Sequence, residues 1–390
     1  MYTIQETFKT PAPISALSFG HASHLFAGSD DGSLRVYDLS TNKVVKAIRN
    51  LDGEVSSIIC FKRPGSELRD AWVAHGRMIS KFKLDTPKMI QTLDDALKSL
   101  TVGEVEDDLV NQLSLNGNKS HLAFGLDSGI IGTVELNTGA VTKLKQKHDN
   151  ICSSVTFIGD RAKDIVSAGY DTTIKHIDFT KDELIAAVKM DTTLPESGVS
   201  LAPPFVISLS LSPSGVLAAG TADGRLGVFF GGEKRTSQKK SKVWGGLNTA
   251  EMMLMKVAEG PIVAMSFSAA RILTITTMLG VITQYELVYD PQADEGRALL
   301  KQLWQGNVTA ALDKVNTMLV DEKRIVIGGM SKDLKGVFEI WKKQGRQPTP
   351  YHGGSCPYTR RVSVGPGRKM RRWGWRLSIR YIVKMYSSSV

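Results

Sequence analysis

The 390-residue sequence predicts an all-β fold, a β-propeller of seven blades, with six or eight blades as the alternatives. One pattern recurs: an apolar alternating strand, a strand rich in small residues, a turn with Asp or Gly, and another apolar strand. Its turns are spaced by roughly 44 to 56 residues, a propeller-blade period lengthened by loops. Most connections lack a helical pattern, which disfavours a parallel α/β sheet.

The copies of this pattern define a domain of residues 1–343. The predicted blades lie near residues 14–53, 54–90, 107–147, 148–190, 203–232, 260–290 and 306–343. Residues 1–10 precede the first copy and have no partner within it. We expect this closing strand to pair as the outer strand of the final blade, because an unpaired sheet edge invites aggregation.

Within a copy, alternation and turn chemistry indicate strands. In SLRVYDL, Leu34 and Val36 would face one way and Arg35 and Tyr37 the other. The expected turns lie near residues 32, 76, 129, 173, 224, 280 and 336. Most of them carry Gly, which adopts positive φ at little cost. Runs such as HLFAGS and VLAAGT end in small residues, as a crowded region around a central axis requires.

Three insertions interrupt the repeats. Residues 91–106 include DDALKSL, for which we expect one or two helical turns, and residues 192–204 read as a flexible loop. Residues 231–260 carry a basic run and then TAEMMLMKVAEG, whose methionines would pack on the propeller or offer a contact surface. The basic run is interpreted as a solvated loop in preference to a nuclear-import or RNA-binding patch.

The charge is concentrated at the C-terminus. The net charge is +10, and residues 342–390 hold twelve Lys and Arg and no Asp or Glu, which leaves −2 for residues 1–341. A nearly neutral body makes nucleic acid an unlikely partner. The basic tail, residues 344–390, is expected to be disordered. It is either an anion-binding tail with interleaved aromatics or an artefact of the gene model, and we favour the artefact.

Composition bounds the location. The chain is 42% hydrophobic and 23% charged, as in soluble globular proteins. It has no apolar run of about 18 residues and no secretory signal, so no membrane partner is expected. Its three cysteines, Cys60, Cys152 and Cys356, are far apart and fit a reducing compartment. We expect a cytoplasmic or nuclear protein, or one found in both.

The chain shows no motif for catalysis or for binding a cofactor or metal. Phosphate-binding loops, His-Glu-x-x-His and Gly-x-Ser-x-Gly are all missing, so we predict no enzyme and no cofactor. His21 and His24 lie in a turn without Cys or carboxylate beside them. His75 is expected in a turn, His176 as a satisfied strand histidine, and Cys152 as an inert buried thiol.

The repeat ends resemble those of the WD-repeat family. Tyr37-Asp38 and Ile177-Asp178 stand where the family carries Trp-Asp. In the fourth copy, the resemblance implies that three residues form the family's structural hydrogen-bond set, namely His148, Ser167 and Asp171. The family's fourth partner is a Trp, and Ile177 stands in its place. The resemblance therefore implies a truncated network that stabilises the blade by about 1 kcal/mol.

A narrower resemblance to one WD-repeat subfamily is strongest over Glu54–Phe179, as in VAHGRMIS and KHDNICSSVTF. It implies a non-enzymatic scaffold for protein–protein interactions and, beyond that, a substrate receptor of a cullin-4 ubiquitin ligase. Such receptors carry a Trp-Asp-x-Arg box that contacts the ligase adaptor. Here the Arg position holds other residues, namely Ser40, Asp85, Asn137, Thr180 and Val288. We therefore rank general scaffolding above adaptor binding.

Two alternatives belong to other classes. A propeller hydrolase would need a substrate site that the sequence does not reveal. An RNA-associated propeller would bind through Lys239, Lys240 and Lys242 together with the basic tail.

Overall fold

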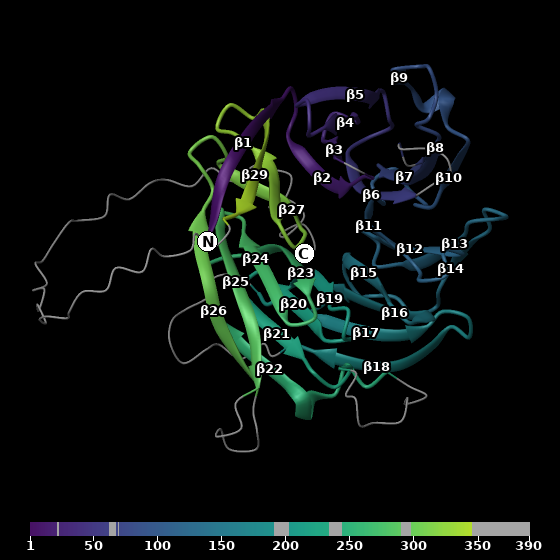
Figure 1. The fold of residues 1–390 in the computed structure, drawn as a ribbon. Coiled ribbons are helices and arrows are strands. Elements are labelled where there is room, and N and C mark those ends of the chain that lie inside the picture. Colours follow the sequence, from purple (N-terminus) through teal and green to yellow (C-terminus); the bar gives the residue numbers. More distant parts are fainter. Residues whose placement is uncertain are drawn as a thin grey trace, which may run out of the picture. The chain divides into compact units, whose positions relative to one another are not determined.

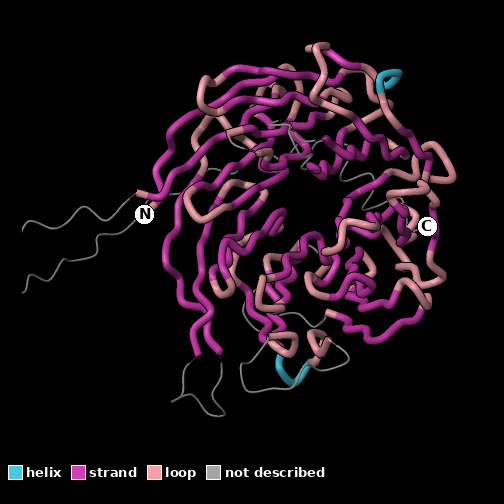
Figure 2. The backbone as a smooth tube through the Cα atoms, turned by 45° about the vertical axis from the view of Figure 1, so that its right-hand side comes forward, coloured by secondary structure: helices cyan, strands magenta, loops and turns pink. Residues whose placement is uncertain are grey.

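The strands of the computed structural model form seven sheets arranged in a ring, so the predicted all-β, seven-bladed propeller is confirmed (Figures 1 and 2). The structure describes residues 1–21, 23–61, 68, 70–190, 203–233, 244–289 and 298–344. Residues 1–344 make one compact unit. The predicted flexible loop in part, the basic run and the basic tail lie outside the described residues.

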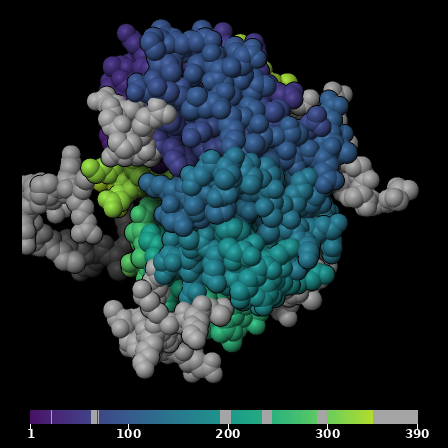
Figure 3. Space-filling model, turned by 90° about the vertical axis from the view of Figure 1, so that its right-hand side faces the viewer, coloured from purple at the N-terminus to yellow at the C-terminus, as the bar shows by residue number. Residues whose placement is uncertain are grey.

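Blades one to four follow the chain in order, each from its inner strand outward, and Figure 3 shows blades two to four side by side (blue to teal). Blade one contains β2 Ile14–Phe19, β3 His24–Ser29, β4 Leu34–Asp38 and β5 Lys43–Ile48. Blade two contains β6 Val55–Phe61, β7 Asp70–His75, β8 Met78–Phe82 and β10 Lys98–Thr101. Blade three contains β11 Val110–Leu115, β12 His121–Leu126, β13 Ile131–Glu135 and β14 Val141–Lys143. Blade four contains β15 Cys152–Ile158, β16 Arg161–Gly169, β17 Thr173–Asp178 and β18 Glu183–Lys189.

Blades five to seven complete the ring. Blade five contains β19 Val206–Leu211, β20 Leu217–Thr221, β21 Arg225–Phe229 and β22 Met252–Lys256. Blade six contains β23 Ile262–Ala269, β24 Ile272–Thr277, β25 Val281–Tyr289 and β26 Ala298–Asn307. Blade seven contains β27 Lys314–Val320, β28 Arg324–Met330, β29 Gly336–Lys343 and the N-terminal strand β1 Tyr2–Thr10. The helical elements of the described chain are two 3₁₀ turns, η1 Leu93–Asp95 and η2 Thr249–Glu251, and neither could cross a membrane.

The N-terminal strand closes the ring. β1 runs antiparallel to β29, with Tyr2 opposite Lys343 and Thr10 opposite Gly336. Strands from the two ends of the described chain therefore share one sheet, and the outer edge of β29 is covered.

Alternation along each strand divides its side chains between two neighbouring blades. Leu34 and Val36 pack toward blade two, and Tyr37 packs toward blade seven. All three are buried. Both faces of β4 therefore contribute to apolar interfaces with the neighbouring blades.

Three predicted blade boundaries are wrong. Blades two, five and six were expected to end near residues 90, 232 and 290, but their outer strands are β10, β22 and β26. β10 and β22 lie within the predicted insertions 91–106 and 231–260, and β26 comes after residues 290–297. None of the three therefore continues the repeat period that marked the boundary. The expected helical turns of residues 91–106 shrink to η1, and a short strand, β9 Ile90–Gln91, pairs in parallel with β5 instead.

The turns follow the predicted chemistry with two shifts. Five of the glycines expected there have positive φ: Gly32, Gly76, Gly129, Gly224 and Gly280. In blade four the positive-φ residue is Thr172, and in blade seven it is Leu334. Thr173 and Gly336, which were expected there, begin β17 and β29.

Candidate functional site

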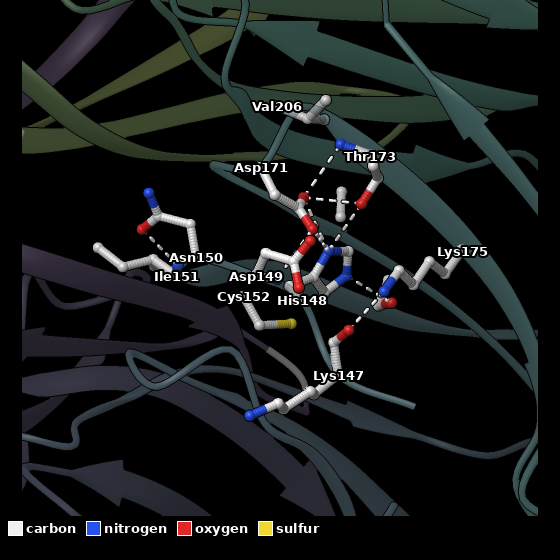
Figure 4. A network of polar contacts seen from close by, with 12 residues as sticks. Lys147, His148, Asp149, Asn150, Ile151, Cys152, Asp171, Thr173, Lys175 and Val206 are labelled. Atoms are coloured by element: carbon white, nitrogen blue, oxygen red, sulfur yellow. Dashed lines mark hydrogen bonds and ion pairs between the residues drawn. The ribbon is translucent and has the colours of Figure 1, made fainter. Parts of the chain in front are cut away.

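The polar network in blade four is built from three separate segments (Figure 4). His148 lies in the connection between β14 and β15, and Ser167 lies within β16. Asp171 occupies the turn from β16 to β17, and Thr173 is the first residue of β17. The fold thus brings the three residues of the predicted hydrogen-bond set together.

The His148 imidazole is hydrogen-bonded on both nitrogens. Nδ1 lies 2.9 Å from Oδ1 of Asp171, and Nε2 lies 2.9 Å from Oγ of Ser167. Because an ionised carboxylate only accepts, Nδ1 carries a proton, and Nε2 shares a hydrogen bond with the Ser167 hydroxyl. Asp171 also accepts from the backbone N–H of Asp149 at 3.1 Å and from the Thr173 hydroxyl at 2.7 Å.

These contacts keep Asp171 ionised. Burial alone would raise the pKa of the Asp171 carboxyl. The hydrogen bond and charge of His148, together with the Thr173 hydroxyl and N–H, outweigh it and hold this pKa well below its usual range. Burial raises the pKa of the neighbouring Cys152 thiol to about 12, so this thiol is not nucleophilic at neutral pH.

Ser, His and Asp in this order of hydrogen bonds are also the components of a nucleophilic triad. Whether a substrate can reach the serine distinguishes a catalytic triad from a structural network. The side chain of His148 is 0% exposed, and Ser167 is 0% exposed in the middle of a strand. A substrate carbonyl cannot reach Ser167 Oγ, so the arrangement supports blade packing and offers no reactive hydroxyl.

The place of the family's Trp is apolar. Ile177 is fully buried and packs with Leu144, Val155 and Ile165 between blades three and four. The network is therefore truncated at this point. Thr173 adds a contact that sequence reasoning missed, since its hydroxyl lies 3.1 Å from Nδ1 of His148. A Thr two residues after Asp, at a strand start, is the signal that could have found it.

The aspartates at the repeat ends hold their own turns. The Asp38 carboxylate accepts from the N–H of Ser40 at 2.9 Å and from the Thr41 hydroxyl at 2.9 Å. The Asp178 carboxylate accepts from the Thr180 hydroxyl at 2.6 Å and pairs with Lys163 at 3.0 Å. Hydrogen bonds, those of Ser40 above all, lower the pKa of Asp38. Ser40 and Thr180, which stand where the adaptor box has its Arg, thus hydrogen-bond to the aspartate of their own turn.

Two other histidines differ from expectation. His75 ends β7 instead of lying in the turn, and its fully buried ring contacts Ser80 Oγ through Nε2 at 2.9 Å. Ser80 in turn contacts Ser99, which ties β7, β8 and β10 together. Burial lowers the pKa of His75. His176 was expected to be satisfied, yet it has no hydrogen bond to any described residue.

The remaining candidates show no metal chemistry. His24 Nδ1 lies 3.0 Å from the backbone carbonyl oxygen of His21, so this pair shapes a turn. Within the described ranges, no group of three His, Cys, Asp or Glu side chains could hold a metal ion.

One face of the ring has a repeated geometry. In six blades, the N–H of the residue opening the turn between the second and third strands donates to the carbonyl just before the inner strand. These pairs, donor first, are Asp30 with Pro13, Gly76 with Glu54, Asp127 with Leu109, Tyr170 with Ile151, Ala222 with Phe205, and Met278 with Pro261. We call the face that carries them the turn face.

An aromatic pair lies on the turn face. The rings of Tyr170 and Phe205 stack with centroids 5.1 Å apart and an interplanar angle of 7°, and both residues are half-buried. Burial, assisted by the charge of Asp127, raises the pKa of Tyr170 to about 12. Its hydroxyl therefore keeps its proton at physiological pH and can donate a hydrogen bond.

A family model, "WD domain, G-beta repeat", matches residues 3–38. That match, the seven sheets in a ring and the His148 network make this chain similar to the WD-repeat β-propellers. The chain is similar to the WD repeat-containing protein 53 homolog of Dictyostelium discoideum, with 26% identity over 206 residues. The alignment covers 48% of this chain and 53% of that relative, so it spans about half of each. The narrower resemblance of residues 54–179 is to this same subfamily.

Proposed function

We propose that this propeller is a non-enzymatic scaffold that binds protein partners through its turn face, centred on Tyr170 and Phe205. The stacked, half-buried rings carry the proposal. Aromatic side chains dominate the binding energy of protein interfaces because they bury much area at little entropic cost. Here the two rings are already held against each other, so ordering them on binding costs little free energy.

The surroundings of the pair suit a protein partner. The Tyr170 phenol lies near the charge of the Asp127 carboxylate, which accepts a hydrogen bond from Asn111 at 3.0 Å. A polar rim around an apolar centre is the usual anatomy of an interface. The scaffold would work in the cytoplasm, the nucleus or both, in keeping with its scattered cysteines.

A double variant tests the turn face. We expect Tyr170→Ala with Phe205→Ala to weaken the partner by roughly 30-fold or more, since each truncation removes about 1–2 kcal/mol of binding. Affinity purification of the full chain followed by quantitative mass spectrometry measures this loss. The matched control is Leu184→Ala with Leu303→Ala, two exposed side chains on the outer strands β18 and β26. Identical partner sets from all three proteins would contradict the proposal.

Recruitment to a cullin-4 ligase is the narrower role, and we rank it lower. The Arg of the adaptor box is missing from every repeat end that can be aligned, and Ser40 and Thr180 are bonded within their own turns. We expect the full chain to bind the purified adaptor only weakly, with Kd above about 1 µM. Tighter binding in a calorimetric titration would reverse this ranking.

The hydrolase and RNA alternatives rank below the scaffold. The buried Ser167 argues against acyl transfer at the one Ser–His–Asp set found among the described residues. The basic run and the tail lie outside the described residues, so the RNA alternative keeps only its sequence argument.

A further inference from the structure

The interface between blades four and five contains a buried histidine among mostly apolar side chains. His176 lies on β17, two residues after Ile174, and points with it toward blade five. Val166 and Ala186 stand opposite it on the adjacent strands. Its exposed fraction is 0%. An imidazole in this position is sensitive to its charge, because protonation would place a cation in an apolar interface.

The charged groups around His176 come from two strands. Nε2 lies 3.7 Å from Oδ2 of Asp164 on β16, which is too long for a hydrogen bond. The Arg161 guanidinium also lies 3.7 Å from this carboxylate oxygen. On β17 itself, Asp178 carries its charge next to Lys163 at 3.0 Å. The adjacent β18 presents only Ala186 opposite the ring.

Trp244 covers the imidazole from the segment that leads into blade five's outer strand. The two rings meet edge to face, with centroids 5.2 Å apart and an interplanar angle of 90°. The indole Nε1–H donates to the backbone carbonyl of Gly215 at 3.2 Å. Trp244 and Leu247 are both buried among the apolar side chains of blades four and five. This segment continues through η2 into β22.

We propose that His176, Asp164 and Trp244 form a pH-sensitive latch, in which the neutral imidazole holds residues 244–248 against blade four and its protonation releases them. Release would let water reach the imidazolium, and it would free the segment that precedes β22. The latch is independent of the turn face and of the partner bound there.

The direction of the pH effect follows from burial. Burial lowers the pKa of His176, and the nearby Asp164 carboxylate opposes this shift without cancelling it. When the segment is released and the ring is hydrated, its pKa should return toward about 6.5. The docked state is then fully favoured above that pH and loses ground as the pH falls through it. One proton changes the docking equilibrium by at most about tenfold per pH unit.

The test uses the full chain labelled with 5-fluorotryptophan and followed by ¹⁹F NMR from about pH 7.5 to about pH 5. The Trp244→Phe variant identifies the Trp244 signal. We expect this signal to shift or broaden with a midpoint below about 6.5, and to stay constant in His176→Gln. Asp164→Asn removes the charge that favours the imidazolium and should move the midpoint to lower pH. Trp72, fully buried between blades two and three, serves as the internal reference.

The matched control variant is His121→Gln, because His121 contacts an aromatic ring, Phe179, but no tryptophan in the described chain. It should leave the Trp244 titration unchanged. A Trp244 signal that does not change with pH overturns the latch, and so does an unaltered titration in His176→Gln. If His176→Gln fails to fold, the Asp164→Asn titration decides, since an unmoved midpoint is also incompatible with the latch.

Discussion

The junction between blades three and four and the junction between blades six and seven are built from different interactions. At the first, which we call the polar junction, inner-strand side chains bond directly to the backbone of the next blade. The Asn111 amide donates to the Cys152 carbonyl at 3.1 Å, and Gln112 accepts from the N–H of Val155 at 2.9 Å. The Ser114 hydroxyl accepts from the N–H of Phe157 at 3.0 Å.

The junction between blades six and seven, the apolar junction, depends on packing. Between the inner strands, Val263 and Ala264 of β23 pack on Val315 and Met318 of β27. A buried hydrogen bond crosses the junction farther out, from Gln284 Nε2 on β25 to the Tyr2 hydroxyl on β1 at 3.3 Å. Farther out, aromatic residues extend the contact: the ring of Tyr2 on β1 lies 5.2 Å from that of Trp304 on β26.

The two junctions show that hydrogen bonds mainly define the geometry of blade packing and that apolar burial mainly stabilises it. Hydrogen bonds require defined distances and angles, so the polar junction fixes how one blade sits on the next, while each bond adds only about 0.5–1.5 kcal/mol. Apolar burial is non-directional and larger in total, at about 25 cal/mol per Å². The apolar junction includes β1, the N-terminal strand, which pairs with β29 and adds the Tyr2 ring to the packing.

Deleting residues 1–10 should have the largest effect. The deletion removes β1, exposes the edge of β29 and strips the Tyr2 and Phe8 rings from Trp304 and Phe338. We expect the single cooperative unfolding transition to be lost, which differential scanning calorimetry would detect. Glu6→Ala, an exposed change in the same strand, should preserve it. An unchanged transition after the deletion would mean that the ring closes without β1.

Met318→Ala should destabilise the fold by about 2–4 kcal/mol, because it leaves a cavity in the apolar junction. Chemical denaturation of the variant measures this. Met255 is 41% exposed on β22, and Met255→Ala should cost less than about 0.5 kcal/mol. Equal losses for the two methionines would show that burial does not govern the apolar junction.

Asp171→Asn should cost about 2 kcal/mol at pH 7, since His148 loses a charge-assisted hydrogen bond at the polar junction. The pKa of Asp171 is lowered in the folded state, so its contribution is complete above its unfolded pKa of about 4. It is lost as the pH falls through the lower, folded value. Denaturation at several pH values should therefore show the two proteins converging in acid. A constant difference down to about pH 2 would refute the charged role.

Gln112→Ala should have the smallest effect, about 1–2 kcal/mol, because the Ser154 hydroxyl and the Val155 N–H lose their acceptor. Gln302→Ala on the exposed part of β26 is the control and should be nearly neutral. If Gln112→Ala proved more costly than Met318→Ala, the assignment of stability to packing and of specificity to hydrogen bonds would be reversed.

Much of this architecture could be predicted from local patterns. The repeated glycine turns and alternating strands lead to seven blades, and the WD-repeat resemblance implies the contact of Ser167 and Asp171 with His148. The outer strands β10, β22 and β26 could not be bounded, because insertions separate each from its blade. The parallel pairing of β9 with β5 could not be predicted from the sequence either. It is supported by Lys46, whose ammonium group donates to the carbonyls of Thr86 and Lys88, about forty positions away.

The sequence alone determines what each short segment does, because strand alternation and turn glycines act over a few residues. Which surfaces meet is decided by how the blades pack and by closure of the ring. Closure sets β1 beside β29, and the packing of blade five on blade four stacks Tyr170 on Phe205 and places Trp244 over His176. Each of these contacts joins residues far apart along the chain, so the free energy that favours it exists only once neighbouring blades are packed.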